Sequence, residues 1–257
     1  MSALTQKGAV TVTAPHIAFD DIGAGDPAVV LLHGLFCNRA YYAAQAQHLA
    51  DRHRVLSIDL RGHGGSDVPE EGYSLDALAG DVIRVCEEAR VTRAVFCGHS
   101  MAVALKVVVR RPDLAAGLVL LDGAVLLPEA QREGLGRLAQ ALETDGWRDA
   151  LLGFFGGIAA GAADRVRADI AAMPRVYAAP LMRDIVSCIS SDHAQELAAV
   201  RCPLKYVHGR MPLDLERFRE LRPDAIVETI PDVGHYLMLT APAKVNAALD
   251  QFLETIR

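Results

Sequence analysis

Short, nearly continuous apolar runs alternate with longer amphipathic stretches along the first half of the chain. The four clearest runs are AVVLLHG (28–34), RVLSIDL (54–60), RAVFCG (93–98) and GLVLLDG (117–123). Apolar, β-branched runs of this length, separated by helical patterns, are typical of strands in a parallel sheet that helices cover on both faces. The pattern therefore predicts an α/β fold.

Two earlier segments predict an antiparallel addition to this sheet. AVTVTA (9–14) and HIAFDDIG (16–23) have strand character and are joined by a short link that contains Pro15. Such a short connection is compatible only with antiparallel neighbours, so we expect a hairpin at the sheet edge. The predicted sheet is therefore mixed, although mostly parallel.

Residues 124–196 interrupt the strand pattern with helical spacing and the glycine-containing GGIAAGAAD (156–164). Strand patterns return in PLKYVHG (203–209) and AIVETIPDVGH (225–235), before a last amphipathic segment at 241–256. Open α/β sheets bind ligands at the carboxyl ends of their strands.

The predicted division is accordingly a core of residues 1–123 and 197–257 and a helical lid of residues 124–196 over that edge.

Charge and cysteine content narrow the class of partner. The net charge of −6 comes without acidic or basic runs, which argues against nucleic acid or an anionic membrane surface and favours a small-molecule partner. Five cysteines without a CxxC pair do not suggest a disulfide framework. The amino terminus lacks a secretory pattern and no apolar stretch reaches the ~18 residues of a membrane span, so we expect a cytoplasmic location.

The segment VFCGHSMAVAL (95–105) passes from a predicted strand into a predicted helix and places Ser100 at the turn. A serine hydroxyl becomes a nucleophile only when a base removes its proton and nearby donors stabilise the resulting oxyanion. Small residues two positions before and after the serine, here Gly98 and Ala102, allow strand and helix to approach closely. The alternative interpretation is that Ser100 caps the helix.

Four segments, VVLLHGLF, SIDLRGHGGSD, FCGHSMA and PDVGHYLMLTAP, resemble those of the α/β-hydrolase family in order and spacing over nearly the whole chain. The resemblance implies the α/β-hydrolase fold, with Ser100 as nucleophile and His235 as base. It also implies an oxyanion hole formed by the backbone amides of Leu35 and Met101. Ala102 departs from the family's glycine and is tolerated if its φ is negative.

The acid that orients His235 has two candidates. Many family members place an Asp three residues after the glycine of the strand corresponding to 203–209, but this position is Pro212 here. Asp122 ends the strand that follows the helix after Ser100. Relatives such as zearalenone-lactonase-like enzymes also carry their acid after this strand, so Asp122 is our preferred acid. Asp214 is the alternative, although it also reads as a helix N-cap.

The other histidines are expected to be structural, and no pair of them has the ligand spacing of a metal site. We therefore expect neither a metal nor a cofactor. Asp59 and Asp67 resemble residues that shape a family loop, and we expect Arg61 to be their partner.

Together these features predict a serine hydrolase that cleaves a carboxylic ester or lactone. The apolar segments LLGFFGG (151–157) and MPRVYAAPLM (173–182) favour a mostly apolar substrate. A C–C bond hydrolase, a cofactor-free dioxygenase that uses a His–Asp pair, and a ligand-sensing receptor of the same fold are alternatives.

Overall fold

The computed structural model describes residues 14–141, 143–172, 184, 186 and 191–256. Within these residues seven strands form one sheet in the order β1-β3-β2-β4-β5-β6-β7. β1 runs antiparallel to β3, and the other neighbouring strands are parallel. The strands are β1 (Phe19–Ile22), β2 (Ala28–Leu32), β3 (Val55–Ile58), β4 (Ala94–His99), β5 (Ala115–Leu121), β6 (Leu204–His208) and β7 (Ile226–Thr229). The predicted mixed, mostly parallel sheet is confirmed.

The predicted edge hairpin is described only in part. Its second segment forms β1 at one edge of the sheet. Residues 9–13 of its first segment lie outside the described residues.

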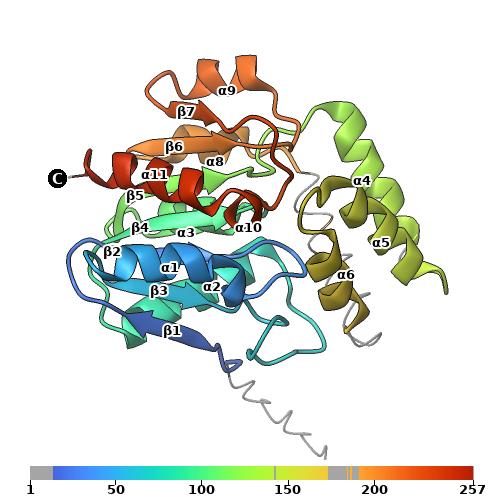
Figure 1. Ribbon diagram of the computed structural model, residues 1–257, viewed down its shortest axis with the longest axis horizontal. Helices are drawn as coiled ribbons and strands as arrows, with labels where there is room; N and C mark the ends of the chain where they lie inside the picture. The colour runs from blue at the N-terminus through green and yellow to red at the C-terminus, as the bar shows by residue number, and fades with distance from the viewer. Residues whose placement is uncertain (1–13, 142, 173–183, 185, 187–190, 257) are drawn as a thin grey trace, which may run out of the picture.

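Helices cover both faces of the sheet (Figure 1). α1 and α11 lie on one face, and α2 and α3 lie on the other. The core helices are η1 (Arg39–Tyr42), α1 (Ala43–Ala50), α2 (Leu75–Glu88), α3 (Val103–Arg110), α9 (Leu215–Leu221), α10 (Leu237–Thr240) and α11 (Pro242–Leu253). This arrangement explains why the central strands lack the alternation of a half-exposed sheet.

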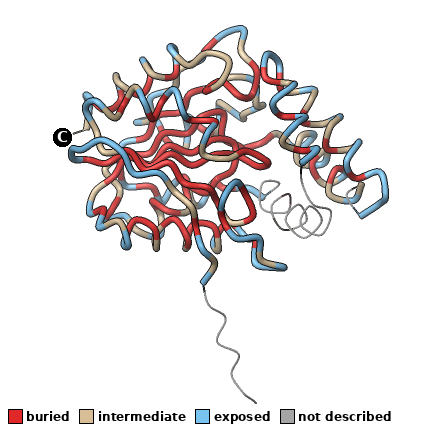
Figure 2. The backbone as a smooth tube through the Cα atoms, turned by 60° about the horizontal axis from the view of Figure 1, so that its bottom comes forward, coloured by how far each residue is buried: buried red, intermediate tan, exposed pale blue. Residues whose placement is uncertain are grey.

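Burial is greatest in the middle of the sheet (Figure 2). Every residue of β2, β3 and β4 is buried, whereas β1 and β7 at the two edges are partly exposed. Each buried Val or Leu side chain stabilises the fold by roughly 1.5–3 kcal/mol. The strands that end at the catalytic candidates are therefore anchored in the most buried part of the molecule.

The helices between β5 and β6 separate into two groups. α4 (Glu129–Ala141), α5 (Trp147–Ile158) and α6 (Ala163–Ala171) lie together beyond the end of the sheet at which β5 ends (Figure 1). α8 (Ala194–Ala199) instead packs against α3, where Glu196 accepts a hydrogen bond of 2.6 Å from Lys106.

The predicted boundary between residues 196 and 197 thus falls inside α8, and the apolar segment 173–182 lies outside the described residues. No helix among the described residues is long and apolar enough to span a membrane.

Candidate active site

Ser100 occupies a tight turn directly after β4 and before α3. Its φ of +62° is in the left-handed region, which non-glycine residues seldom adopt except where the surroundings enforce it. Its amide donates to the carbonyl of Leu121 at 3.1 Å, and its own carbonyl accepts from the amide of Ala124 at 2.6 Å. The turn is thus fixed from the neighbouring strand β5, and Ser100 does not cap α3, whose N-cap is Ala102.

Gly98 and Ala102, the small residues two positions before and after Ser100, differ in whether the structure has room for a side chain. A Cβ at Gly98 would lie 2.6 Å from the Cβ of Ala104, so α3 approaches β4 too closely for any side chain there. Ala102 has φ −77°, which is unstrained for alanine. The departure from glycine at this position therefore imposes no backbone strain, as we expected for a negative φ.

His235 and Asp122 form a buried pair. Asp122 follows β5, and its Oδ2 lies 2.8 Å from Nδ1 of His235, with both residues at most 1% exposed. Three consecutive backbone amides, those of Gly209, Arg210 and Met211, also donate to this carboxylate at 2.8–3.1 Å. Burial would raise the pKa of Asp122, but the hydrogen bonds and the charge of His235 hold it below its ordinary value. Asp122 is therefore an ionised acceptor that favours the Nδ1–H tautomer of His235.

Asp214 does not take part in this arrangement. Its carboxylate accepts from the amide of Arg217 at 3.1 Å and caps α9. Of the two predicted acids, the structure brings Asp122 to His235, because β5 lies between the strand that carries Ser100 and the strand that leads to residues 209–211.

The backbone of His235 is held on both sides. Its amide donates to the carbonyl of Ile158 at 3.0 Å, at the end of α5, and its carbonyl lies 3.0 Å from Nε2 of His99. A Cβ at Gly234 would lie 2.6 Å from the carbonyl oxygen of Ala160, so glycine permits this close approach. The helices between β5 and β6 thus contact the candidate base directly, a contact that no sequence motif indicated.

His99 links the nucleophile turn to the base. Its ring centroid lies 4.5 Å from that of His235. Burial, and to a lesser extent His235, lowers its pKa well below the ordinary value. His99 is therefore neutral and donates from Nε2 to the carbonyl of His235. Its Nδ1 is buried, has no hydrogen-bond partner among the residues that the structure describes, and would lie 2.6 Å from a Cβ at Gly34.

Two further buried histidines hold the loop that carries Leu35. Nε2 of His63 accepts from the amide of Phe36 at 3.2 Å, and Nε2 of His33 accepts from the amide of Leu60 at 3.0 Å. Burial lowers the pKa of His33 to about 4 and that of His63 to about 3, so both are neutral acceptors at neutral pH. The sequence indicated structural roles for both but not that His63 fixes the residue after Leu35.

The predicted oxyanion donors are buried next to Ser100. Met101 follows the serine in the chain, and Leu35 lines the same cavity as Ser100. In the part of the chain that the structure describes, neither amide donates a hydrogen bond to another protein group, and none joins Ser100 Oγ to Nε2 of His235. Catalytic hydrogen bonds are often long before a substrate binds.

Ser100 opens into a cavity of about 290 Å³. α4 and α5 form much of its wall, with Leu135 and Leu138 from the first and Phe154 and Phe155 from the second. Among the described residues that line it, only Ser100 and Gln131 have polar side chains. The candidate nucleophile Ser100 therefore lies beside an apolar space.

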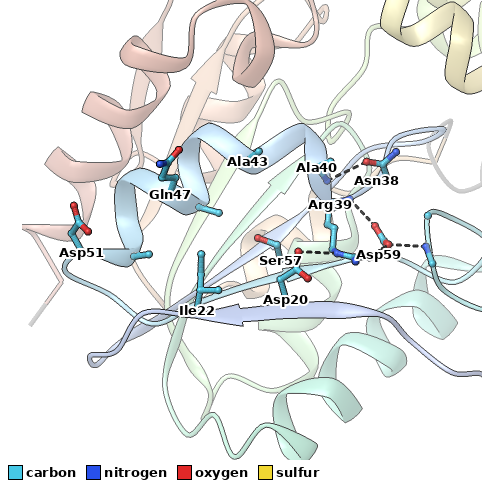
Figure 3. Close-up of a pocket in the computed structure, with 14 residues that line it drawn as sticks. Asp20, Ile22, Asn38, Arg39, Ala40, Ala43, Gln47, Asp51, Ser57 and Asp59 are labelled. Atoms are coloured by element: carbon cyan, nitrogen blue, oxygen red, sulfur yellow. Dashed lines mark hydrogen bonds and ion pairs between the residues drawn. The ribbon is translucent and has the colours of Figure 1, made fainter.

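A separate groove of about 710 Å³ lies between β1 and α1 (Figure 3). Arg39 binds Asp20 at 2.9 Å and also pairs with Asp59 there, so its charge is neutralised.

The expectation that Arg61 pairs with Asp59 or Asp67 is wrong. Arg61 instead binds Asp81 at 2.5 Å, because Asp59 turns toward the amide and guanidinium of Arg39.

Comparison with known proteins gives consistent results. The sequence model described as "Alpha/beta hydrolase family" matches residues 29–248. A 2-(acetamidomethylene)succinate hydrolase of Mesorhizobium japonicum is 26% identical over 90% of this chain and 89% of that protein. A Karrikin insensitive 2 receptor IA of Petunia hybrida is 25% identical over 86% of this chain and 88% of that protein. Among solved structures, a thermophilic esterase from Thermogutta terrifontis superposes with a TM-score of 0.79 at 25% identity, covering 96% of each chain.

Proposed function

Because the chain is an enzyme of the alpha/beta hydrolase family, we propose that it hydrolyses a carboxylic ester or lactone of a mostly apolar small molecule through an acyl-enzyme on Ser100. The observation that carries the proposal is the position of Ser100, which lines an apolar cavity at the sheet edge where His235 pairs with Asp122. Nucleophile, base and orienting acid are the three groups that acyl transfer to water needs.

In the acylation step, Ser100 Oγ attacks the carbonyl carbon while its proton passes to Nε2 of His235. The amides of Leu35 and Met101 stabilise the negative charge that forms on the carbonyl oxygen. The intermediate then expels the alkoxide, which takes the proton from His235 and leaves as an alcohol. With a lactone, the new hydroxyl stays attached to the acyl group.

In the deacylation step, His235 removes a proton from water, and the hydroxide attacks the acyl carbon. Ser100 Oγ leaves and recovers the proton from His235, which releases the carboxylic acid. Asp122 keeps the imidazole in one tautomer and stabilises the imidazolium that forms in each step.

The cavity indicates the substrate class. About 290 Å³ is at the small end of ligand sites, and its walls are aliphatic and aromatic. No charged side chain lines it among the described residues. A small, uncharged, mostly apolar acyl group therefore suits this space better than an anionic one.

The test is hydrolysis of p-nitrophenyl esters with acyl chains of increasing length by wild type and Ser100→Ala. Wild type is expected to turn over with a burst and to carry one acyl group per chain in intact-mass spectra. Ser100→Ala is expected to lose about 10³-fold or more of the rate and all of the adduct. Ser74→Ala, which removes the N-cap of α2, is the matched control and is expected to keep full activity.

Two of the alternative functions are separated from ester hydrolysis when oxygen consumption is measured beside this experiment. A ligand-sensing receptor of this fold would bind its ligand and hydrolyse none of these esters at an appreciable rate. A cofactor-free dioxygenase consumes oxygen and retains activity in Ser100→Ala. Either outcome would overturn the ester hydrolase proposal.

A further inference from the structure

The loop that follows β6 lies against the carboxylate of Asp122. The amide of Gly209 donates to its Oδ1 at 2.8 Å, and the amides of Arg210 and Met211 donate to its Oδ2 at 3.1 Å and 2.8 Å. Successive amides converge on one anion only where the backbone folds into a concave turn. The support that Asp122 receives from these amides therefore depends on the shape of the loop.

His208, the last residue of β6, holds the far end of this loop. Its Nε2 lies 2.9 Å from the carbonyl oxygen of Met211. A carbonyl can only accept a hydrogen bond, so Nε2 carries the proton and donates. The backbone of His208 is fixed in the sheet, because its carbonyl accepts from the amide of Ile230 at 2.9 Å and the residue pairs with Thr229 of β7. The ring therefore ties the loop to a rigid strand end.

The loop also lies in close contact with both halves of the catalytic pair. A Cβ at Gly209 would lie 3.3 Å from the carbonyl oxygen of Gly234 and 3.4 Å from Cγ of Asp122. Gly234 immediately precedes the candidate base His235. A small change in the turn would therefore displace the amide donors relative to acid and base alike.

The three amides matter because Asp122 is 0% exposed. A buried carboxylate stays ionised only where donors replace the water that it has lost. Burial would raise the pKa of Asp122, and the amides of Gly209 and Met211 are among the groups that lower it, after His235. If the loop moved away, Asp122 would bind a proton more readily or turn toward other donors, and either change would weaken its hold on His235.

We infer that His208 is a positioning residue that acts through Asp122. Its Nε2–H holds the loop after β6 in the turn that presents three amides to this carboxylate, and Asp122 thereby stays in place for His235. The inference rests on the proposed function, since it concerns the acid of the same site. His208 does not line the cavity at the candidate nucleophile, so its effect passes through the loop. The interpretation to be excluded is that the ring serves only to pack near Tyr206, whose ring centroid lies 6.1 Å away.

The test compares His208→Leu, which removes the donor, with His208→Gln, whose side-chain N–H can take the place of Nε2–H. The matched control is His48→Leu, because Nε2 of His48 contacts Asp250 at 2.8 Å and His48 does not line the cavity. Two rates are measured on folded variants: kcat for p-nitrophenyl butyrate, and the rate at which a fluorophosphonate labels Ser100. In labelling, Ser100 Oγ bonds to phosphorus, its proton passes to the base and fluoride leaves, so this rate reports the activated serine whatever the natural substrate is.

We expect His208→Leu to lower both rates by about 10- to 100-fold, because a small displacement of a catalytic group is costly. His208→Gln should recover most of this loss, and His48→Leu should behave as wild type. If His208→Leu does not fold, His208→Asn, whose amide is one methylene shorter than that of glutamine, replaces it with the same expectation.

Repeating His208→Leu in the Asp122→Asn background separates positioning from a structural role. If His208 acts through the carboxylate, the added substitution should change the residual labelling rate by less than about twofold. An equal loss in both backgrounds would mean that His208 serves the fold independently of the acid, and the inference would be wrong.

The two rates also separate this inference from the proposed function. Ester hydrolysis by wild type with unchanged rates in His208→Leu would refute the inference and leave the proposed function standing. Labelling of wild type without ester hydrolysis would refute the proposed function, and a loss of labelling of about tenfold or more in His208→Leu would still support the inference. Absence of both labelling and hydrolysis in wild type would refute both.

Discussion

The carboxyl edge of the sheet and the cavity wall formed by α4 and α5 differ in their hydrogen bonds and in the room they leave for added atoms. At the sheet edge, Asp122 accepts four hydrogen bonds, and added atoms at Gly34 or Gly98 would collide with neighbours. In the wall, the side chains that line the cavity are almost all apolar, and a Cβ at Gly153 would meet nothing within 4 Å. Under the proposed function, the strand ends hold the catalytic groups, and α4 and α5 bound the space that receives the substrate.

The largest difference is expected when one methyl group is added in each region. Gly34→Ala would place a Cβ 2.6 Å from Nδ1 of His99 and 3.0 Å from the Cβ of Ser100. Displacing this loop moves the amide of Leu35, so ester hydrolysis should fall by about 10²–10³. Gly153→Ala on α5 has room and should keep activity while stabilising the helix by roughly 0.5–1 kcal/mol.

Rates and unfolding curves of the two alanine variants check this prediction together. Equal losses of activity in both would show that the two regions do not differ in the way described.

The second prediction concerns the hydrogen bond from His99 to the carbonyl of His235, the candidate base. His99→Leu removes the donor to the carbonyl of His235 and should lower kcat by about 10- to 100-fold, because misplacing a catalytic group by a small distance is costly. His99→Gln retains an N–H donor and should recover part of this loss. Steady-state kinetics of the two variants, each checked for folding by circular dichroism, separate positioning from bulk packing. If both variants lose the same amount, the hydrogen bond is not what matters.

The third prediction follows from the neutral histidines that hold the oxyanion loop. His33 and His63 have folded pKa values of about 4 and about 3, whereas the unfolded value is near 6.5. As the pH falls below about 6.5, the unfolded chain therefore binds protons that the folded chain does not, and the free energy of unfolding falls by about 1–3 kcal/mol per histidine by pH 4–5.

Urea unfolding at several pH values measures this slope. His63→Gln should flatten it, since a glutamine does not titrate. An unchanged slope in His63→Gln would contradict the assignment of a buried neutral acceptor.

The smallest effect is expected in the wall. Leu138→Ala enlarges the cavity from α4 without touching the sheet edge. The preference for long over short acyl chains should rise by about 3- to 10-fold in kcat/KM, since a methylene in an apolar pocket is worth roughly 1–3 kcal/mol. Turnover of the acetate ester should change less than twofold. Leu152→Ala on α5, which does not line the cavity, serves as the control.

The sequence predicted more about the sheet edge than about the wall formed by α4 and α5. The strands and the order of Ser100, Asp122 and His235 along the sheet edge followed from apolar runs and from family motifs. The sequence left Asp122 and Asp214 open, because the choice depends on three amides of residues 209–211 that converge only in space. Helical spacing predicted α4 and α5 but did not indicate which of their residues line the cavity beside Ser100.

His99 shows a different limit. Its place in the elbow motif was evident, but its hydrogen bond to the carbonyl of His235 joins residues far apart in the chain. The carbonyl of Ile158 that holds the amide of His235 could not be predicted either, because backbone carbonyls leave no residue-type signal. Hydrogen bonds between distant main-chain groups therefore cannot be predicted from the residue types in this sequence.

In the proposed mechanism, Asp122 orients His235 so that its imidazole takes the proton of Ser100. The most direct measurement is hydrolysis of p-nitrophenyl butyrate by Asp122→Asn and Asp214→Asn, with both variants shown to be folded. Asp122→Asn should lower kcat by about 10³–10⁴-fold, because asparagine favours the wrong tautomer of the base, whereas Asp214→Asn should change kcat by less than about twofold. Full activity of Asp122→Asn together with a crippled Asp214→Asn would contradict it.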